Sequence, residues 1–412
     1  MATIVQKYGG TSVAGPEEIR RVAGRIVKTA EAGNRVCAVV SAMGHTTDEL
    51  IELAAKVSAN PHPRELDMLL TAGERISMAL VSMAINELGH EAASFTGSQA
   101  GIVTDTSHGR ARIVEMRHGR VHEALADGKI AIVAGFQGVS TSHDVTTLGR
   151  GGSDTTAVAM AAALGADVCE IYTDVDGVYS ADPRIVPNAR KLKQVSFEEM
   201  LDLAASGTRV LALRSVEYAR NHGVRIHVRS SFNESEGTWI VKEEDMEQAI
   251  ISGIAHDTSE AKVTIRRVPD QPGVAGRTFR PLADSGINVG EIVQNTSVDG
   301  HADISFTLPE IELERAAPIL EKLSDAIGAE GFTSEREIAK VSVVGAGMRS
   351  NPGVAAAIFE SLAEAGINIE IISTSSIRVS CVVPAADCER AVNVIHERLK
   401  LADDVDYQGG AA

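Results

Sequence analysis

An internal repeat constrains the C-terminal part of the chain more than any other feature. The stretch "PGVAGRTFRPLADSGINVGEI" at Pro272 returns as "PGVAAAIFESLAEAGINIEII" at Pro352, an interval of 80 residues from position 272 to position 352. Each copy reads as a strand, a Pro-Gly turn, a helix, a Gly-Ile-Asn turn, two strands and a second helix. This is the order of a small βαββαβ unit. The repeat therefore predicts two such domains, at 261–335 and 336–412.

The first 240 residues have a different pattern, in which strands alternate with helices. "TIVQKYG" predicts a short strand, "EEIRRVAGRIVKTAEAG" an amphipathic helix and "RVCAVVSAMG" an apolar strand of the kind buried in parallel sheets. This alternation indicates an α/β domain at 1–240, with an open, mostly parallel sheet sandwiched by helices. Ligands of such sheets bind at the carboxyl ends of the strands. Residues 241–260, within and beyond a polar stretch, are assigned to a linker.

Composition excludes several classes of function. The chain has 412 residues, of which 44% are hydrophobic and 23% charged, as expected of a packed globular protein. Its net charge of -17 argues against a nucleic-acid-binding surface. The four cysteines have no metal-ligand spacing, so we interpret them as buried reduced thiols. We find no signal peptide and no uncharged apolar run of roughly 18 residues, and we expect a soluble cytoplasmic protein that does not bind membranes.

A glycine loop follows the first predicted strand. In "VQKYGGTSVAG" the lysine, Lys7, comes before the glycines, Gly9 and Gly10. The Walker pattern places its lysine after the glycines, and the dinucleotide pattern needs G-x-G-x-x-G. The loop therefore indicates an anion site that belongs to neither pattern.

A second anion site is indicated by "LGRGGSDTTAVAMAAALGA". Arg150, two glycines, Ser153 and Asp154 come directly before an Ala-rich helix. Free backbone N–H groups and the positive end of the helix dipole would face a ligand there. The alternative is that Ser153 or Asp154 only caps the helix. Capping does not explain the Arg-Gly-Gly before it, so we favour an anion site.

Other polar residues give weaker signals. Asp174 and its neighbours in "YTDVDGVYSADPRIV" fit a turn as well as a nucleotide or metal site. Ser41 and Thr47 follow another strand. Glu74, beside Arg75 in a predicted helix, more commonly indicates a solvated or locally paired charge than a ligand contact.

The missing motifs narrow the chemistry. We find no Ser-His-Asp constellation, zinc spacing or cysteine nucleophile. Phosphoryl transfer to a carboxylate needs none of these, because a carboxyl group with a pKa of about 4 is already ionised at neutral pH. The protein has only to align two anions and neutralise charge on the transferring group.

These motifs together carry a resemblance to a known family. "KYGGTSV", "SAMG" with "TTDEL", "TAGERIS", "SFTGSQAG", "GFQG", "TTLGRGGSDTTA" and "YTDVDGVYSADPRIV" resemble the aspartokinases of the amino-acid kinase family. The doubled tail resembles their two ACT domains. The similarity runs nearly end to end and is strongest to the lysine- and threonine-sensitive aspartokinases of actinobacteria. It implies phosphorylation of L-aspartate by ATP, with Mg²⁺ bridging the ATP phosphates and no separate metal site on the protein.

The resemblance also implies roles for individual residues. Lys7, Arg150 and Asp154 would be catalytic. The aspartate site would comprise Ser41, Thr47, Glu74, Arg150 and Ser153. The ATP site would comprise Lys7, Tyr8, Gly9, Gly10, Thr173, Asp174, Tyr179, Arg184 and Arg209. The last of these departs from the family, which usually has a lysine where this chain reads "SGTRVL". A planar guanidinium differs from a compact ammonium, so we expect retained activity with altered ATP affinity.

In the repeats, the resemblance implies an amino-acid effector site between the ACT domains of neighbouring subunits. The implied effector-binding residues are Asp270, Gly273, Ala275, Gln294, Asn368 and Ile371; the alternative is that these residues only make turns and core. Gly290 stands where the family usually has aspartate, Glu291 where methionine is usual, and Ser376 where an acid is usual. We expect weakened or altered feedback inhibition by lysine and threonine.

Two further alternatives remain open at this point. Met246 lies where relatives begin a separate small subunit, which would imply an α2β2 assembly in place of a homo-oligomer, but such a methionine is more commonly a linker residue. The chain could also be another amino-acid kinase, such as glutamate 5-kinase or acetylglutamate kinase, or a silent amino-acid sensor. Paired ACT copies with "TAGERIS" disfavour the other kinases, and the presence of Lys7, Arg150, Asp154 and Asp174 disfavours the sensor.

Overall fold

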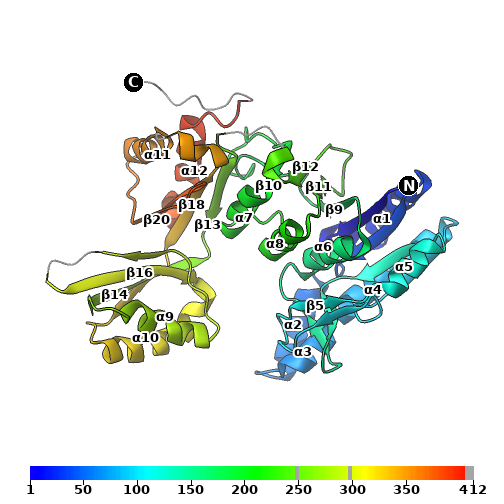
Figure 1. Cartoon of the computed structure of the whole chain (residues 1–412), viewed down its shortest axis with the longest axis horizontal. Helices are drawn as coiled ribbons and strands as arrows, with labels where there is room; N and C mark the ends of the chain where they lie inside the picture. The colour runs from blue at the N-terminus through cyan, green and yellow to red at the C-terminus, as the bar shows by residue number, and fades with distance from the viewer. Residues whose placement is uncertain (246–249, 296–298, 352, 404–412) are drawn as a thin grey trace. The chain divides into compact units, whose positions relative to one another are not determined.

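The structure is a computed structural model that describes residues 1–245, 250–295, 299–351 and 353–403 (Figure 1). It divides into two compact units. The first comprises Met1–Val178, Lys191–Ala204 and Arg209–Glu247, and the second comprises Tyr179–Arg190, Ala205–Thr208 and Gln248–Ala412. Two short stretches of the predicted α/β domain thus belong to the second unit.

The first unit contains an eight-stranded sheet. In the described residues, every neighbouring pair of its strands is parallel except β11 and β12. The predicted open, mostly parallel sheet is therefore confirmed. The strands in order across the sheet are β10 (Gln194–Ser196), β12 (Thr238–Val241), β11 (Ile226–Ser230), β9 (Val168–Thr173), β1 (Thr3–Tyr8), β2 (Arg35–Val40), β6 (Ile130–Ala134) and β3 (Ala92–Phe95).

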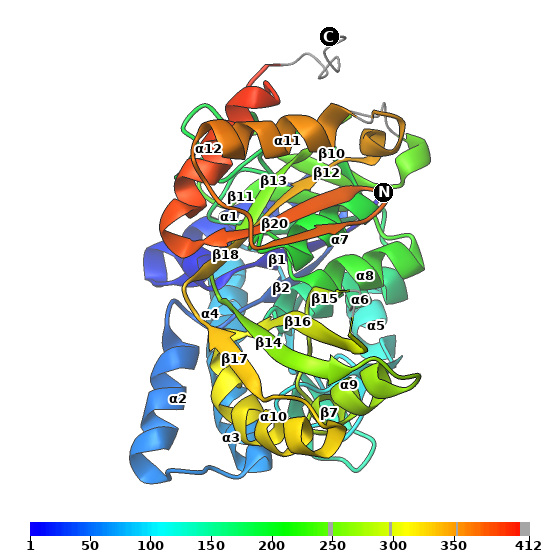
Figure 2. The same cartoon turned by 90° about the vertical axis from the view of Figure 1, so that its left-hand side faces the viewer.

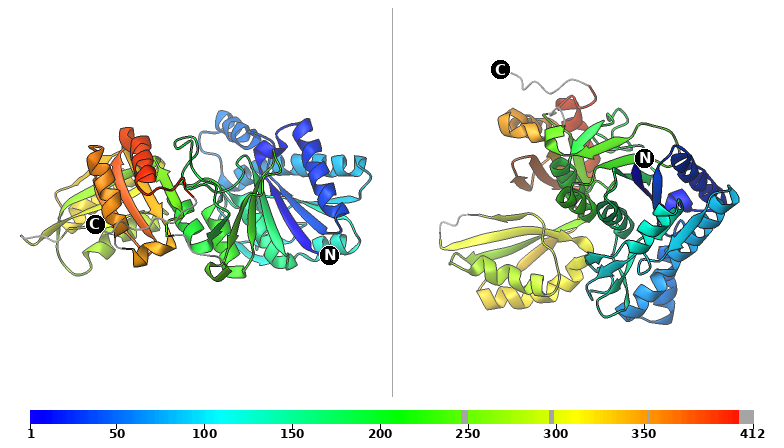
Figure 3. Two further views of the ribbon diagram at one scale, coloured as in Figure 1. Left: turned by 90° about the horizontal axis from the view of Figure 1, so that it is seen from above. Right: turned by 45° about the vertical axis from the view of Figure 1, so that its right-hand side comes forward.

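Helices cover both faces of this sheet, as Figure 3 shows. Val36, Ala38 and Val40 alternate along β2 and share one apolar cluster with α1 and α4, because successive strand side chains point to opposite faces. Helix α6 packs against β1, β2 and β9, and α8 packs against α6. The helices of this unit are α1 (Pro16–Glu31), α2 (Thr46–Val57), α3 (Pro63–Leu70), α4 (Ala72–Glu87), α5 (Gly119–Ala126), α6 (Gly152–Leu164), α7 (Phe197–Ala205), α8 (Leu213–His222) and the short 3₁₀ helices η1 (Gly10–Val13) and η2 (Glu243–Asp245).

A smaller sheet completes the first unit. Its four strands are, in order, β5 (Ile113–Met116), β4 (Ile102–Thr104), β7 (Gln137–Ser140) and β8 (Val145–Thr147). One helical stretch in the described part of the chain, Pro63–Glu87, is long and apolar enough to cross a membrane. Val81 and Ile85 of this stretch are buried in the core with β2 and β6. We therefore interpret it as a core helix.

A buried polar network links three strands of the large sheet. Glu170 on β9 accepts hydrogen bonds from Gln6 Nε2 at 2.8 Å, Tyr172 OH at 3.0 Å and Arg229 Nη1 at 3.2 Å. Burial, together with the Glu170 charge, raises the pKa of Tyr172 to about 12, so its hydroxyl stays a donor. A buried carboxylate is tolerated only when it is paired and hydrogen-bonded in this way.

The second unit contains two four-stranded sheets. In the first repeat, the strands in order are β15 (Ile292–Gln294), β16 (His301–Pro309), β14 (Glu260–Pro269) and β17 (Phe332–Glu335). Helices α9 (Val274–Asp284) and α10 (Leu313–Ile327) lie together against one face of this sheet (Figure 2). A short 3₁₀ helix, η3 (Glu310–Glu312), precedes α10. The chain order is β14, α9, β15, β16, α10 and β17, which is the predicted βαββαβ unit.

The second repeat takes one strand from outside its own sequence. Its sheet runs β13 (Gly253–Asp257), β18 (Ile338–Val344), β20 (Arg378–Pro384) and β19 (Ile371–Thr374). Strand β13 precedes the first repeat in the chain and takes the place that β17 has in the first repeat. It falls inside the stretch 241–260 that we assigned to a linker. The other elements are η4 (Ala346–Ser350), α11 (Gly353–Glu364), η5 (Ala385–Asp387) and α12 (Cys388–Arg398).

The Glu170 network makes a testable prediction. Glu170→Ala would leave the partly buried Arg229 guanidinium without its carboxylate, and we expect it to lower the free energy of unfolding by about 3 kcal/mol. Trp239 is the only tryptophan of the chain and lies in the first unit. Its fluorescence during denaturant unfolding measures the free energy of unfolding of that unit. Glu115→Ala breaks the exposed pair with Arg117 and should leave the free energy of unfolding almost unchanged, because exposed ion pairs contribute little to stability. Equal losses in the two variants would contradict the assignment.

Candidate active site

Two of the sequence motifs meet at Lys7. This residue lies near the end of β1, and its Nζ atom is 2.7 Å from Oδ1 of Asp154 in the first turn of α6. Each side chain is only 12% exposed. Lys7 of the glycine loop and Asp154 of the second motif, far apart in sequence, therefore form an ion pair at the carboxyl end of β1.

Glycines allow the strand ends to come close around this centre. A Cβ atom at Gly9 would lie 3.4 Å from Lys7 Nζ, and one at Gly10 would lie 3.0 Å from the carbonyl oxygens of Ala42 and Gly44. The Gly9 N–H donates to Tyr172 O at 3.3 Å, so this amide is engaged within the protein. Gly10 and the Lys7 ammonium are the parts of the loop that we propose for phosphate.

Tyr8 lies on the other face of the sheet from Lys7. The resemblance places Tyr8 at ATP, but its side chain is fully buried and its ring stacks on Tyr172 with centroids 4.9 Å apart. Its hydroxyl donates to Gln6 Oε1. At the strand end Tyr8 offers only its backbone, whose carbonyl accepts from Ser41 N at 3.0 Å.

The start of α6 shows why two glycines precede Ser153. Gly151 has a φ of +73° and a Cβ there would lie 2.3 Å from Ala212 Cβ, so a side chain is excluded. Gly151 occupies the N-cap position and has no side chain with which to cap the helix. Asp154 points at Lys7, so the interpretation that it only caps the helix is wrong. Arg150 is exposed and has no ion pair among the described residues.

Gly135 is not among the predicted site residues, but it leaves the space that Ser153 occupies. Gly135 follows β6 in the "GFQG" motif, and a Cβ at this position would lie 2.6 Å from Ser153 Oγ. Only glycine lets the buried Ser153 approach the strand end so closely. A glycine directly after an apolar strand was the available signal.

Glu74 is neither solvated nor paired with a neighbouring charge, so that interpretation was wrong. Its side chain is 3% exposed, and Oε1 accepts from the backbone N–H of Ala42 at 3.1 Å. Its Oε2 atom is buried without a hydrogen-bond partner among the described residues. Burial raises the pKa of Glu74 to about 7. The Glu74 carboxyl group therefore titrates near neutral pH.

Ser41 and Thr47 flank the turn that brings Ala42 to Glu74. Ser41 follows β2, and its carbonyl accepts from Ser77 Oγ at 2.6 Å. Thr47 is in the first turn of α2 and is partly exposed. Both residues thus come after the strand that neighbours β1, on the side where Glu74 binds the Ala42 backbone.

The residues implied for the nucleotide fall in three places. Thr173 ends β9 and donates to Oδ1 of the exposed Asp174 at 3.0 Å. Tyr179 and Arg184 belong to the stretch that groups with the second unit, where Arg184 pairs with Asp182 at 2.6 Å. Arg209 is exposed, four positions after the end of α7.

The carboxylates of this site suit a metal ion that binds together with the phosphates of a nucleotide. The described residues contain no group of three or more His, Cys, Asp or Glu side chains that could hold a metal ion. Magnesium commonly binds through substrate phosphates, waters and one or two carboxylates. The exposed carboxylate of Asp174 can supply such a ligand.

The implied effector residues are spread over turns and strand ends of the two repeats. Asp270 N donates to Gly300 O, Gly273 is the N-cap of α9 with a φ of +88°, and Ala275 lies in α9. Gln294 ends β15, opposite Ile304. In the second repeat, Asn368 lies before β19, and Ile371 is buried at its start. Met246 lies outside the described residues.

Gly290 and Glu291, which differ from the residues usual in the family, both lie close to residues of other elements. A Cβ at Gly290 would lie 2.4 Å from Thr307 Oγ1, so an aspartate would fit only if Thr307 moved. Glu291 is buried, its carboxylate has no hydrogen bond among the described residues, and Oε1 is 3.9 Å from Arg378 Nη2. The Glu291 carboxylate is therefore turned toward Arg378 of the second repeat.

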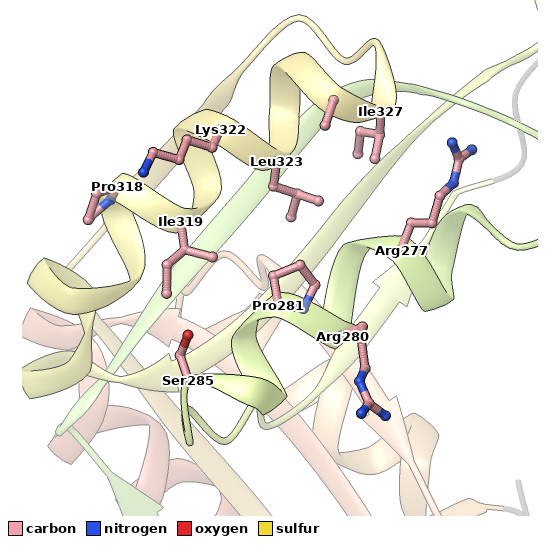
Figure 4. Close-up of a pocket in the computed structure, with 10 residues that line it drawn as sticks. Arg277, Arg280, Pro281, Ser285, Pro318, Ile319, Lys322, Leu323 and Ile327 are labelled. Carbon is pink, nitrogen blue, oxygen red and sulfur yellow. The ribbon is translucent and has the colours of Figure 1, made fainter.

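A cavity of about 760 Å³ lies elsewhere, between α9 and α10 of the first repeat (Figure 4). Ile319 and Leu323 point from α10 toward α9, and Arg277, Arg280 and Lys322 also line the cavity. Its lining includes none of the implied effector residues. We therefore do not assign it to the effector site.

Comparison with known proteins places this geometry in a family. The amino acid kinase family matches residues 2–230, and the ACT domain matches residues 263–328 and 341–399. The chain is 58% identical over 410 residues to the aspartokinase of Mycolicibacterium smegmatis, with 98% of this chain and 97% of that one covered. It is 57% identical over 410 residues to the aspartokinase of Corynebacterium glutamicum, with the same coverage.

The chain belongs to the aspartokinases. It is thus an ATP-dependent kinase with two ACT domains, and the end-to-end match decides against the other amino-acid kinases. A crystal structure of E. coli aspartokinase III in complex with aspartate and ADP is also similar, with a TM-score of 0.85 at 25% identity. The similarity covers 97% of this chain and 100% of that one. The roles of individual residues in this aspartokinase remain predictions.

The raised pKa of Glu74 predicts a dependence of stability on pH. The unfolded glutamate titrates near 4.5 and the folded one near 7, so stability present at low pH is lost as the pH rises through this window. Glu74→Gln keeps an acceptor for Ala42 without the charge. We expect the free energy of unfolding of this variant, relative to wild type, to rise by about 3 kcal/mol between pH 4.5 and 8.

Trp239 fluorescence during denaturant unfolding at several pH values measures this difference. Glu52→Gln is the matched control, because Glu52 is an exposed glutamate of the neighbouring α2. The control should differ from wild type by the same small amount at every pH. A constant difference for Glu74→Gln as well would show that Glu74 does not titrate in this window.

Proposed function

We propose that the chain transfers the γ-phosphoryl group of ATP to the β-carboxylate of L-aspartate, giving 4-phospho-L-aspartate. This is the first step toward lysine, methionine and threonine. The observation that carries the site assignment is the Lys7–Asp154 pair at 2.7 Å, at the carboxyl end of the sheet. The aspartokinase family supplies the reaction class, and the pair supplies a fixed cation where the phosphoryl group would pass.

Lys7 acts on the phosphoryl group in transit. Its ammonium neutralises the negative charge on the transferring group, and Asp154 holds that ammonium in place before the substrates arrive. No general base is needed to remove a proton from the acceptor, because a carboxylate is already ionised at neutral pH. Catalysis then rests on alignment and charge neutralisation.

Aspartate binds through charges that the protein does not use internally. Arg150 is exposed and has no ion pair among the described residues, so its planar fork is free for a carboxylate. Glu74 Oε2 has no hydrogen-bond partner in the same part of the chain, and the substrate ammonium would supply one. Ser41, Thr47 and Ser153 line the same site. An ammonium beside Glu74 would favour its ionised form.

ATP binds on the side of β9. Thr173 and Asp174 follow this strand, and Tyr179, Arg184 and Arg209 add contacts to the nucleotide, with the Gly10 backbone at the phosphates. Magnesium bound with ATP would neutralise charge on the phosphates. The exposed carboxylate of Asp174 is the ligand that the protein offers to it.

Regulation by amino acids is assigned to the two ACT domains. We infer that lysine and threonine bind at ACT interfaces between subunits, in a homo-oligomer or an α2β2 assembly in the cytoplasm. The lack of a side chain at Gly290 and the inward turn of Glu291 remove acids from the surface that an effector would contact. Feedback inhibition is therefore weakened or altered.

One assay tests the activity and its regulation. Purified full-length protein is given ATP, Mg²⁺ and aspartate, ADP release is followed, and the acyl phosphate is trapped with hydroxylamine. We expect ADP release that depends on aspartate and a matching yield of hydroxamate. Glutamate and N-acetylglutamate serve as control acceptors, and lysine and threonine are then added singly and together. Aspartate-independent ADP release without hydroxamate would refute the function, and full inhibition by both amino acids would refute weakened regulation.

Lys7→Ala tests the role of the loop lysine. We expect kcat to fall by about 10²–10³-fold, the usual loss on removal of one group that stabilises transition-state charge. The Kd for aspartate should change far less, because Lys7 acts on the phosphoryl group. Lys28→Ala removes an exposed lysine from α1 and should leave both quantities unchanged. A Lys7→Ala enzyme with normal kcat and weakened aspartate binding would place Lys7 at the wrong substrate.

A further inference from the structure

A segment of the α/β sequence is built into the second ACT domain. The segment 179–190 leaves the first unit after Val178 and returns at Lys191. A backbone hydrogen bond from Leu192 N to Val178 O, at 2.8 Å, closes the base of this excursion. Residues 205–208 make a second, shorter excursion. Both stretches therefore have their packing partners in the second unit.

Ser180 is the main polar anchor of the segment. Its carbonyl accepts from Ile254 N of β13 at 2.8 Å, and its Oγ lies 3.0 Å from Nε2 of His396 on α12. The same Oγ accepts from Arg190 N at 2.9 Å. Ser180 and His396 are both buried. Because the hydroxyl oxygen is already an acceptor, its proton is free to be donated to His396 Nε2.

The direction of this bond depends on the tautomer of the histidine. When Ser180 donates, His396 Nε2 carries no proton, and the ring is neutral and protonated at Nδ1. Burial lowers the pKa of His396, which acts in the same direction. A neutral buried imidazole and a buried hydroxyl thus satisfy each other.

Apolar packing fixes the rest of the segment. Ala181 and Val186 are buried in the core cluster of the second ACT domain, which includes residues of β18, β20 and α12. Asn393 of α12 donates from Nδ2 to Ile185 O at 3.2 Å. The segment is therefore held along most of its length by the regulatory domain.

The second excursion rests on the same strand. Gly207 has a φ of +112°, and a Cβ there would lie 2.1 Å from the carbonyl oxygen of His256 on β13. Any side chain at Gly207 would have to displace the backbone of either the loop or the strand. Strand β13 thus contacts both excursions, at Ile254 and at His256.

These excursions carry or adjoin residues proposed for ATP. Tyr179 precedes Ser180, Arg184 lies within the segment, and Arg209 follows Gly207 by two positions. We propose that Ser180 and His396 are positioning residues for ATP: the second ACT domain, through β13 and α12, fixes the backbone that presents these nucleotide contacts. The inference rests on the proposed function. It predicts that the state of this ACT domain sets the affinity for ATP and leaves the aspartate site unaffected.

Substitutions of His396 test this in the full-length enzyme. His396→Leu replaces the imidazole with an apolar side chain that cannot hydrogen-bond, and we expect KM for ATP to rise about five- to tenfold, as for the loss of one buried hydrogen bond. The values of kcat and of KM for aspartate should change less than twofold. His396→Gln offers Oε1 as an acceptor to Ser180 and should restore KM for ATP to within twofold of wild type.

Two further variants separate positioning from stability. Ser180→Ala breaks the same bond from the other side and also removes the acceptor of Arg190 N, so KM for ATP should rise at least as much as in His396→Leu. Ser342→Ala is the matched control, since it removes a buried 2.8 Å bond to Ser380 within the same ACT sheet. It should lower the Tm to a similar extent and leave KM for ATP unchanged.

The outcomes distinguish this inference from the proposed function. If wild type shows no aspartate-dependent ADP release, the proposed function fails, and binding of a non-hydrolysable ATP analogue then replaces KM as the readout. If wild type is active but ATP affinity stays within twofold in both His396→Leu and Ser180→Ala, the inference alone is overturned. Equal changes in KM for ATP and for aspartate would also overturn it, as would a similar rise in the Ser342→Ala control.

Discussion

The ion pair between Lys7 and Asp154 is the constraint on which the first unit depends. Two charges that are almost removed from water are stable only when each is the counterion of the other. The pair requires β1 and α6 to meet with a fixed register, and glycines at two separate strand or helix ends make this approach possible. Gly135 and Gly151 each lie where a Cβ atom would be under 3.0 Å from a neighbouring side-chain atom. The glycines thus allow the backbone segments to approach closely enough for the two charges to pair.

The two faces of the large sheet carry different polar groups. Lys7 and Asp154 lie on one face, whereas Tyr8, next to Lys7, turns to the other and stacks on Tyr172. On that second face, Glu170 ties β1, β9 and β11 together through Gln6 and Arg229. Since neighbouring residues of a strand point in opposite directions, one strand can hold the paired ammonium of Lys7 on one face and a buried hydrogen-bond network on the other.

Much of this fold follows from local sequence patterns. Alternating strands and helices predicted the parallel sheet, because periodicity and turn residues act over short distances. The repeat predicted two βαββαβ units, and the first copy has this order, whereas the second takes β13 from an earlier part of the chain as its fourth strand. Positions such as Lys7 and Asp154 could be assigned to strand and helix ends for the same reason. The burial of Glu74 could not, because it depends on Ala42, which approaches from another element. The excursion 179–190 was also missed, since its packing partners lie more than 60 positions away.

The strand β13 makes the first ACT domain an insertion within the second. The chain lays down one edge of a sheet at Gly253–Asp257, builds an entire separate domain, and only then supplies β18, with which that edge pairs. During synthesis, β13 has no partner strand until Ile338–Val344 has been made. Pairing two strands that are so far apart in the sequence is slow, because it closes a long loop at a cost in chain entropy. A fragment that begins after Asp257 would lack this edge strand, whereas a fragment that begins before Gly253 would contain all four strands of the sheet. The order in which the chain is made therefore places completion of the second regulatory domain near the end of folding.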